Sequence, residues 1–125
     1  MTTTKTNSRV YSLKEMKELS GLSEDTLRYY EKIGILPGIS RLPNGHRQYS
    51  QHDLDWLQFV LCLRSTGMPL KEIKTYRELQ ERGDSTVLQR KVLLLSQKEK
   101  ILGELDTLHL ALKRINHKIE YYDSL

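Results

Sequence analysis

The feature that most constrains this chain is the stretch 84–122, which holds no proline and a single glycine, Gly103. Apolar residues recur in it every three or four positions, which predicts one continuous helix with an apolar stripe. At 1.5 Å per residue that helix would be roughly 57 Å long, far longer than the core that precedes it. We expect a second copy of the same helix to cover the stripe, giving a homodimer. The residues predicted to pair the two copies are Leu88, Val92, Leu95, Leu102, Leu105, Leu112, Ile115 and Ile119.

The alternative is that this helix folds back on the N-terminal part of its own chain. A sharp return needs residues that break a helix, and apart from Gly103 the stretch has none. The pattern therefore favours the dimer.

Two short helices joined by a tight turn are predicted near the N-terminus. Ser12 and Glu15 form a capping-box pattern that begins the first helix, which Gly21 ends. Ser23 is placed to cap the second helix, which runs to Gly34. Two short helices with a turn of about three residues between them are typical of a helix-turn-helix.

A β-hairpin is predicted directly after this helix pair. The Asn44-Gly45 pair is a strong signal for a two-residue turn, because both positions tolerate a positive φ. The flanking residues 39–41 and 46–49 are short and polar, and they carry basic side chains, so they do not make a core sheet. A small basic hairpin in this position predicts a wing.

Two further helices complete the predicted DNA-binding domain. Ser50 and Asp53 form a second capping box, which opens a helix to about Thr66, and a fourth helix spans 69–82. The four helices bury a core of roughly 70 residues, which is workable for independent folding. We expect a mainly α-helical chain with a disordered tail at 1–9, a winged helix-turn-helix domain at 10–83 and a coiled-coil dimerisation helix at 84–123.

Charge and cysteine content narrow the class of protein. The net charge is +4, with nine basic against seven acidic residues in 1–70 and eleven against nine in 71–125, so bulk charge does not locate a DNA-binding face. No apolar run approaches the roughly 20 residues of a membrane helix and no signal peptide is visible, so we expect a cytoplasmic protein with no membrane partner. The single cysteine, Cys62, excludes an intrachain disulfide and a zinc site of several thiolates, and we expect no metal and no cofactor.

Three motifs follow one another along the chain. They are Thr26-Leu27-Arg28-Tyr29-Tyr30-Glu31 with Ile33-Gly34-Ile35-Leu36-Pro37, then Asn44-Gly45-His46-Arg47-Gln48-Tyr49, then Gly67-Met68 with Leu70-Lys71-Glu72-Ile73. Over residues 10–122 the chain resembles the MerR family of bacterial transcription regulators. The resemblance implies a homodimer, joined by an antiparallel coiled coil, that binds a palindromic operator in double-stranded promoter DNA. It further implies that the dimer distorts a promoter with an overlong spacer, so that RNA polymerase contacts both promoter elements.

Basic and aromatic side chains of the helix pair and the hairpin are the candidate DNA contacts. Arg28 and Tyr29 lie on the polar side of the second helix, where arginine suits a phosphate or a guanine edge and tyrosine suits a phosphate. Arg41 and Arg47 flank the hairpin turn, from which they can straddle a backbone or enter a minor groove.

Three other candidates have a second possible role. Ser12, at a helix N-terminus, can present amides and a hydroxyl to phosphate or simply cap the helix. Tyr30 follows Leu27 at helical spacing and so can pack instead, and Tyr49 can buttress the wing. The complete set of predicted DNA contacts is Ser12, Thr26, Arg28, Tyr29, Tyr30, Arg41, Asn44, Gly45, Arg47, Tyr49 and Lys71.

Cys62 is the candidate sensor residue. The chain ends at Leu125 with no appended ligand-binding domain, and residues 82–86 hold no cysteine, which argues against drug and metal sensing. A lone cysteine in the third helix resembles the short MerR regulators that respond to aldehydes, nitrosative stress or other electrophiles, a chemistry that needs a thiolate. The alternative is a small buried hydrophobic residue between Leu61 and Leu63. The sequence leaves both interpretations open.

Two other classes of protein are possible alternatives to a regulator. An architectural or excisionase-like DNA-binding protein without an effector shares the winged fold, but such proteins usually lack a dimerisation stripe. An enzyme is not expected, because the chain shows no glycine-rich phosphate loop and no nucleophile–base pair. The histidines do not have the spacing of a ligand pair and are expected at the surface or an interface; they are His46, His52, His109 and His117.

Overall fold

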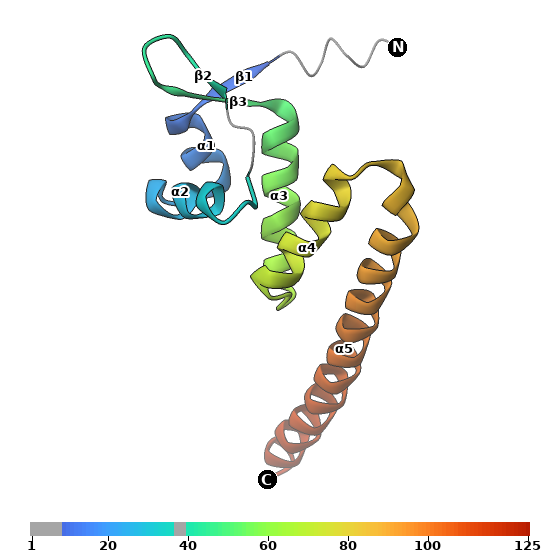
Figure 1. Ribbon diagram of the computed structural model, residues 1–125. Helices are drawn as coiled ribbons and strands as arrows, with labels where there is room; N and C mark the ends of the chain where they lie inside the picture. The colour runs from blue at the N-terminus through green and yellow to red at the C-terminus, as the bar shows by residue number, and fades with distance from the viewer. Residues whose placement is uncertain (1–8, 37–39) are drawn as a thin grey trace. The chain divides into compact units, whose positions relative to one another are not determined.

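The computed structural model describes residues 9–36 and 40–125. The chain divides into two compact units, Met1–Glu78 and Leu79–Leu125 (Figure 1). The predicted tail, except for Arg9, lies outside the described residues, and so do Pro37 of the first motif and Ile39 of the predicted hairpin.

The first unit contains the predicted helix pair. Helix α1 (Leu13–Ser20) begins at a complete capping box, in which Ser12 Oγ accepts from the Glu15 amide at 3.1 Å and the Glu15 carboxylate accepts from the Ser12 amide at 2.9 Å. Gly21 ends the helix with a φ of +75°, a conformation that costs glycine nothing. Helix α2 (Glu24–Lys32) is capped by Ser23, whose hydroxyl accepts from the Thr26 amide. The predicted helix-turn-helix is therefore confirmed.

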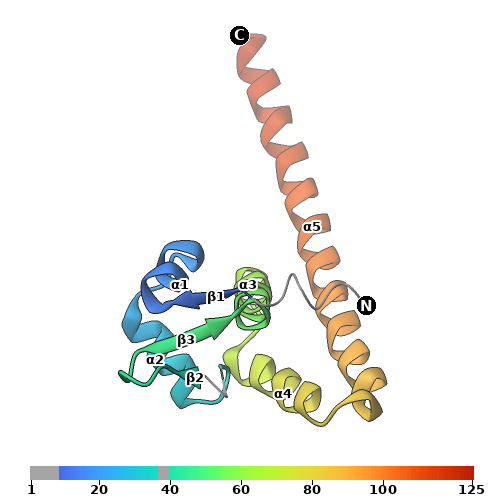
Figure 2. The same ribbon diagram turned by 90° about the horizontal axis from the view of Figure 1, so that it is seen from above.

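Three short strands form an antiparallel sheet beside these helices (Figure 2). Strand β3 (Arg47–Ser50) lies between β1 (Val10–Ser12) and β2 (Ser40–Arg41). Strands β2 and β3 are the predicted wing, whereas β1 is not predicted by the sequence pattern. A strand of three residues carries too little alternation to be recognised, and its partner lies far along the chain.

The wing turn differs from the predicted two-residue type. The Leu42 carbonyl accepts from the Gly45 amide and the Leu42 amide donates to the His46 carbonyl, both at 2.8 Å, so the loop has three residues. Gly45 has a φ of +89°, but Asn44 does not adopt a positive φ. This is a type I turn followed by a left-handed glycine, and Pro43 favours it because its ring fixes the φ that the first central position needs.

Helices α3 (Gln51–Ser65) and α4 (Leu70–Glu81) close the core of the first unit. The predicted capping box of α3 is present, with Ser50 Oγ accepting from the Asp53 amide at 3.0 Å. The Trp56 indole donates to the Ile35 carbonyl at 2.7 Å and stacks on Tyr76 of α4 at 5.9 Å between ring centroids. These contacts tie α3 both to the segment that follows α2 and to α4.

The second unit is dominated by one long helix. A short 3₁₀ turn, η2 (Asp84–Thr86), comes first, so α5 (Val87–Asp123) begins three residues later than the start predicted at residue 84. It is unbroken over 37 residues, and every residue from 102 to 125 is exposed. In the described part of the chain nothing covers this end of the helix, and no described helix is long and apolar enough to cross a membrane.

The start of α5 is joined to the end of α4 by side-chain hydrogen bonds. The Thr86 hydroxyl lies 2.5 Å from the Leu79 carbonyl and 2.8 Å from the Gly83 carbonyl. Arg90 donates to Thr86 Oγ1 and to the Gly83 carbonyl, each at 3.1 Å. These bonds satisfy carbonyls that the ends of helices otherwise leave without a partner.

Candidate nucleic-acid interface

Helix α2 presents a polar outer face. Leu27 and Tyr30 are buried, at 0% and 6% exposure, and anchor the inner face of the helix. Arg28 and Tyr29 are exposed, and Arg28 pairs with Glu24 one turn earlier. Tyr30 therefore takes the packing role, and its predicted DNA contact does not fit its burial. Arg28 and Tyr29 remain in position to reach a ligand.

The wing tip presents a second polar surface. Arg41 is exposed, and one of its guanidinium nitrogens donates to the Gly45 carbonyl at 2.9 Å. Asn44 uses its side-chain carbonyl to accept from the His46 amide at 3.0 Å, which stabilises the loop. The loop is thus stabilised by its own contacts, and Arg41 of β2 is held beside it while remaining exposed.

Arg47 and Tyr49 do not share that exposure. Tyr49 is fully buried, and its hydroxyl donates to the Glu31 carboxylate at 3.1 Å. Arg47 Nε lies 3.0 Å from the same carboxylate, and the Arg47 and Glu31 side chains are only 15% and 18% exposed. For Tyr49 the buttressing alternative fits and a phosphate contact does not. Arg47, predicted to contact DNA, is mostly buried and pairs with Glu31, and it lines the groove described below.

Glu31 is the residue of this site that the sequence analysis does not single out. Glu31 matters because two side chains of strand β3 bond to it. Arg47 and Tyr49 are two residues apart, so they lie on the same face of that strand. In the sequence, only this spacing of two residues indicates that Arg47 and Tyr49 share a face of a strand. The spacing does not predict which carboxylate they contact. The contact joins residues 16 and 18 positions apart.

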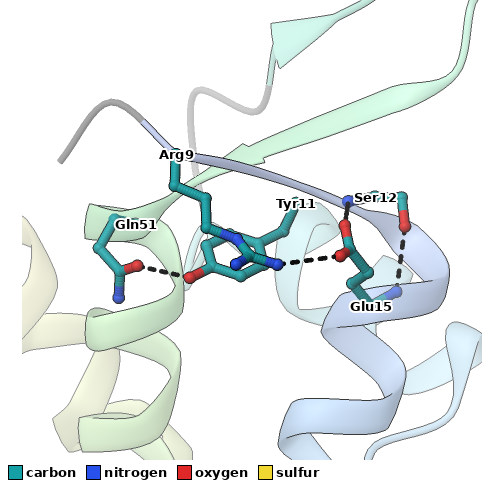
Figure 3. Close-up of polar contacts among 5 residues, drawn as sticks. All are labelled: Arg9, Tyr11, Ser12, Glu15 and Gln51. Carbon is teal, nitrogen blue, oxygen red and sulfur yellow. Dashed lines mark hydrogen bonds and ion pairs between the residues drawn. The ribbon is translucent and has the colours of Figure 1, made fainter. Parts of the chain in front are cut away.

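The N-terminus of α1 is already occupied by a carboxylate (Figure 3). The amide of Ser12 donates to Glu15, and this bond is the main reason why the pKa of Glu15 lies below its ordinary value. Arg9 pairs with Glu15 at 3.2 Å and lies over the Tyr11 ring, whose hydroxyl donates to Gln51 at 2.5 Å. A phosphate at Ser12 would have to approach beside this carboxylate, with Arg9 offsetting its charge. Arg9, the last residue of the predicted tail, therefore contacts both β1 and α1.

A groove of about 730 Å³ brings the helix pair and the wing together. It lies between β1 and the first turn of α1, the outer side of α2, and the wing. Five of the predicted contacts line it, namely Ser12, Arg28, Arg41, Gly45 and Arg47. The other six do not: they are Thr26, Tyr29, Tyr30, Asn44, Tyr49 and Lys71, of which Tyr29 on α2 and Lys71 on α4 are exposed. The basic residues along it are Lys14, Arg28, Arg41, His46 and Arg47.

Cys62 lies apart from this groove, on α3. It is exposed, which contradicts the buried-hydrophobe interpretation. Its carbonyl accepts from Ser65 Oγ at 2.6 Å, a local bond of the helix end. Within the described ranges, no three His, Cys, Asp or Glu side chains come together in the way metal ligands would.

A helix pair with an outward arginine and tyrosine, bordered by a basic β-wing, defines a winged helix-turn-helix protein that binds DNA. Comparison with known proteins gives the family. Residues 11–80 match the family described as MerR HTH family regulatory protein, and residues 54–118 match the one described as MerR, DNA binding. The chain belongs to the MerR family of DNA-binding transcription regulators, a family that is not enzymatic.

Individual relatives agree with this assignment. An uncharacterized HTH-type transcriptional regulator of Haemophilus influenzae is 35% identical over 112 residues, covering 90% of this chain and 83% of that protein. The HTH-type transcriptional regulator AdhR of Bacillus subtilis is 35% identical over 82 residues, covering 66% of this chain and 59% of AdhR.

Solved structures show the same fold. The chain is similar to HiNmlR, a MerR family regulator lacking the sensor domain and crystallised with promoter DNA, at a TM-score of 0.82 and 34% identity over 93% of this chain and 92% of that one. A MerR family regulator of Listeria monocytogenes gives a TM-score of 0.84 and 36% identity, covering 90% of this chain and 86% of that one.

Stability at alkaline pH should report on the Tyr49–Glu31 contact. Burial, and then the charge of Glu31, raises the pKa of Tyr49 well above its ordinary value of 10.0. The folded protein therefore keeps Tyr49 protonated where the unfolded chain ionises it, so this stabilisation is complete below pH 10 and is lost as the pH rises further. In urea unfolding, Tyr49→Phe should cost about 1–2 kcal/mol at neutral pH and show a shallower decline above pH 10.

Tyr29→Phe is the matched control, because Tyr29 is exposed. Its stability should follow that of the unsubstituted protein across the whole pH range. Equal alkaline slopes for Tyr49→Phe and the unsubstituted protein would show that the Tyr49 hydroxyl is not held as described.

Proposed function

We propose that this protein acts in the bacterial cytoplasm as a homodimeric MerR regulator that binds a palindromic promoter operator and distorts its DNA. RNA polymerase then responds indirectly, through the altered spacing of the promoter elements. The observation that carries the proposal is the basic groove between α2 and the wing, in a chain that is similar along almost its whole length to a regulator crystallised with promoter DNA.

The proposed contacts follow from exposure. Arg28 and Tyr29 of α2 read the major groove, while Arg41 and the Asn44-Gly45 loop contact the backbone or the minor groove. The remaining proposed contacts are supporting ones to phosphate, from Ser12, Thr26 and Lys71.

Arg41 is the wing cation for which the salt dependence of binding gives a direct test. Each phosphate contact by a cation releases about one counterion from DNA, so Arg41→Ala should weaken binding and lower the slope of log K against log salt by about one unit. The measurement is fluorescence anisotropy with promoter DNA at several salt concentrations. Arg64→Ala is the control, since Arg64 is exposed on α3 and does not line the groove. An Arg41→Ala slope equal to that of the control would remove Arg41 from the interface.

The homodimer is supported by the exposed apolar stripe of α5. The eight residues predicted to pair the two copies are 43–76% exposed in the single chain, among them Leu88 and Ile115. Leaving such a stripe in water is unfavourable by roughly 25 cal/mol for each Å² of apolar surface. A second α5 can bury it along its length, as in a two-stranded coiled coil.

A charge placed on the stripe should separate the two chains. We expect a solution mass of twice 14.7 kDa for the unsubstituted protein and a symmetric nuclease footprint between promoter elements. Ile115→Lys should shift the mass towards one chain and abolish the symmetric footprint, while Asn116→Lys, an exposed neighbour off the predicted stripe, should change neither. A single-chain mass at concentrations where DNA is bound would refute the dimer. An asymmetric footprint away from promoters would favour an architectural DNA-bending protein instead.

Cys62 is proposed as the sensor of aldehydes or related electrophiles. The support is its exposure on α3, which gives a reagent access to the sulfur. In the reaction with an aldehyde the thiolate sulfur forms a bond to the carbonyl carbon, and the carbonyl oxygen takes up a proton. No oxidant is needed, and the product is a reversible thiohemiacetal.

Cys62→Ser should separate sensing from DNA binding. The variant should bind promoter DNA with unchanged affinity but lose the transcriptional response to formaldehyde in a reporter assay, because a hydroxyl is a far weaker nucleophile than a thiolate. Ser65→Ala is the control for local disturbance of α3, since it removes only the bond to the Cys62 carbonyl. A response that persists in Cys62→Ser would show that the sensor lies elsewhere.

A further inference from the structure

The wing needs a support that the sheet does not supply. Strand β1 pairs with β3 at Gln48, Tyr49 and Ser50, whereas the outermost pair of the sheet, Arg41 with Arg47, is made by β2 and β3 alone. A two-stranded ribbon is only marginally stable in water. Something other than β1 must therefore hold the outer part of the wing beside α2.

Glu31 lies where that support is needed. Its carboxylate pairs with Arg47 Nε at 3.0 Å and accepts a hydrogen bond from the Tyr49 hydroxyl at 3.1 Å. Two residues on the same face of β3 therefore contact one side chain of α2. Arg47 belongs to the pair that β1 does not reach, and Tyr49 belongs to a pair that it does. The Glu31 contacts thus bridge the two parts of the wing.

The charges favour the same role. Arg41 and Arg47 are directly opposite in the ribbon, and like charges in that arrangement destabilise a strand pair. Glu31 offsets the charge of Arg47, while Arg41 stays exposed. Because Glu31 and Arg47 are largely buried, their attraction is screened less than that of an exposed pair.

We propose that Glu31 is a positioning residue that holds the wing against α2, and that Arg47 serves DNA binding through Glu31 instead of by contacting a phosphate. The two DNA-contacting elements then meet the duplex as one rigid body, which lowers the entropic cost of binding. This inference rests on the proposed promoter-binding function.

The test uses the fact that two explanations predict opposite changes in DNA affinity when Glu31 is replaced. Removing a negative charge beside DNA normally strengthens binding, so electrostatics alone gives Glu31→Gln and Glu31→Ala an affinity at least equal to that of the unsubstituted protein. The locked wing gives the opposite result, with Glu31→Ala roughly ten-fold weaker, as expected for one lost charge-assisted contact, and Glu31→Gln in between. Glu18→Gln is the matched control, because Glu18 is exposed on α1, does not line the groove and carries the same charge.

The probe is a DNA duplex selected from a random-sequence pool by the unsubstituted protein. Hydroxyl-radical footprints of the variants should lose the protection given by the wing while keeping that given by α2. Circular dichroism confirms folding, and Glu31→Gln carries the test should Glu31→Ala unfold, because glutamine keeps the size and an acceptor for Tyr49.

A double-mutant cycle with Arg47→Ala separates the two possible roles of Arg47. If Arg47 acts through Glu31, the double variant binds no more weakly than the weaker single variant; additive losses would give Arg47 a DNA contact of its own and overturn the proposal. Affinities of the Glu31 variants equal to or above that of Glu18→Gln would overturn it as well. Failure of the unsubstituted protein to select any duplex would instead refute the proposed function.

Discussion

The burial of one face of α2 is the constraint from which the interface follows. Leu27 and Tyr30 are three residues apart and both lie in the core, so the rotation of the helix about its axis is set. The Tyr30 carbonyl also accepts from the amides of Ile35 and Leu36, which brings the chain back towards the core immediately after the helix. With that face inward, Arg28 and Tyr29 have to point outward. The outward orientation of Arg28 and Tyr29 is therefore set by the packing of Leu27 and Tyr30 on the opposite face of the helix.

The parts of this structure that sequence predicts are the local ones. The serine caps at positions 12, 23 and 50 depend on residues three positions away, and all three form as predicted. Strand β1 and the role of Glu31 depend on partners distant in sequence, which no short pattern specifies. The wing loop differs from the predicted two-residue turn because the fixed φ of Pro43 favours a type I turn over the type that Asn-Gly indicates. Arginines look alike in sequence whether or not they find an internal partner, and for that reason the pairing of Arg47 with Glu31 is not predicted.

The two units use apolar surface in different ways. The first buries Met16, Leu57 and Ile73 completely and makes a core of its own. The second exposes most of its leucines and isoleucines along α5, and this apolar surface is not buried within the single chain. In the proposed homodimer, folding of the DNA-binding unit and assembly of two copies would be separable and would depend on different parts of the chain. Concentration bears on assembly far more than on folding.

Thr86 and Arg90 form hydrogen bonds with the end of α4 and with Gly83, which follows it. These bonds restrict how many residues the segment between α4 and α5 can have. Each residue of an α-helix turns the next by about 100° around the axis. An insertion between Gly83 and Thr86 would either break the bonds to the Leu79 and Gly83 carbonyls or rotate the whole apolar stripe to another side. Asp84 and Ser85, in contrast, are exposed. We therefore expect substitutions at positions 84 and 85 to be tolerated, whereas insertions or deletions between Gly83 and Thr86 should not be.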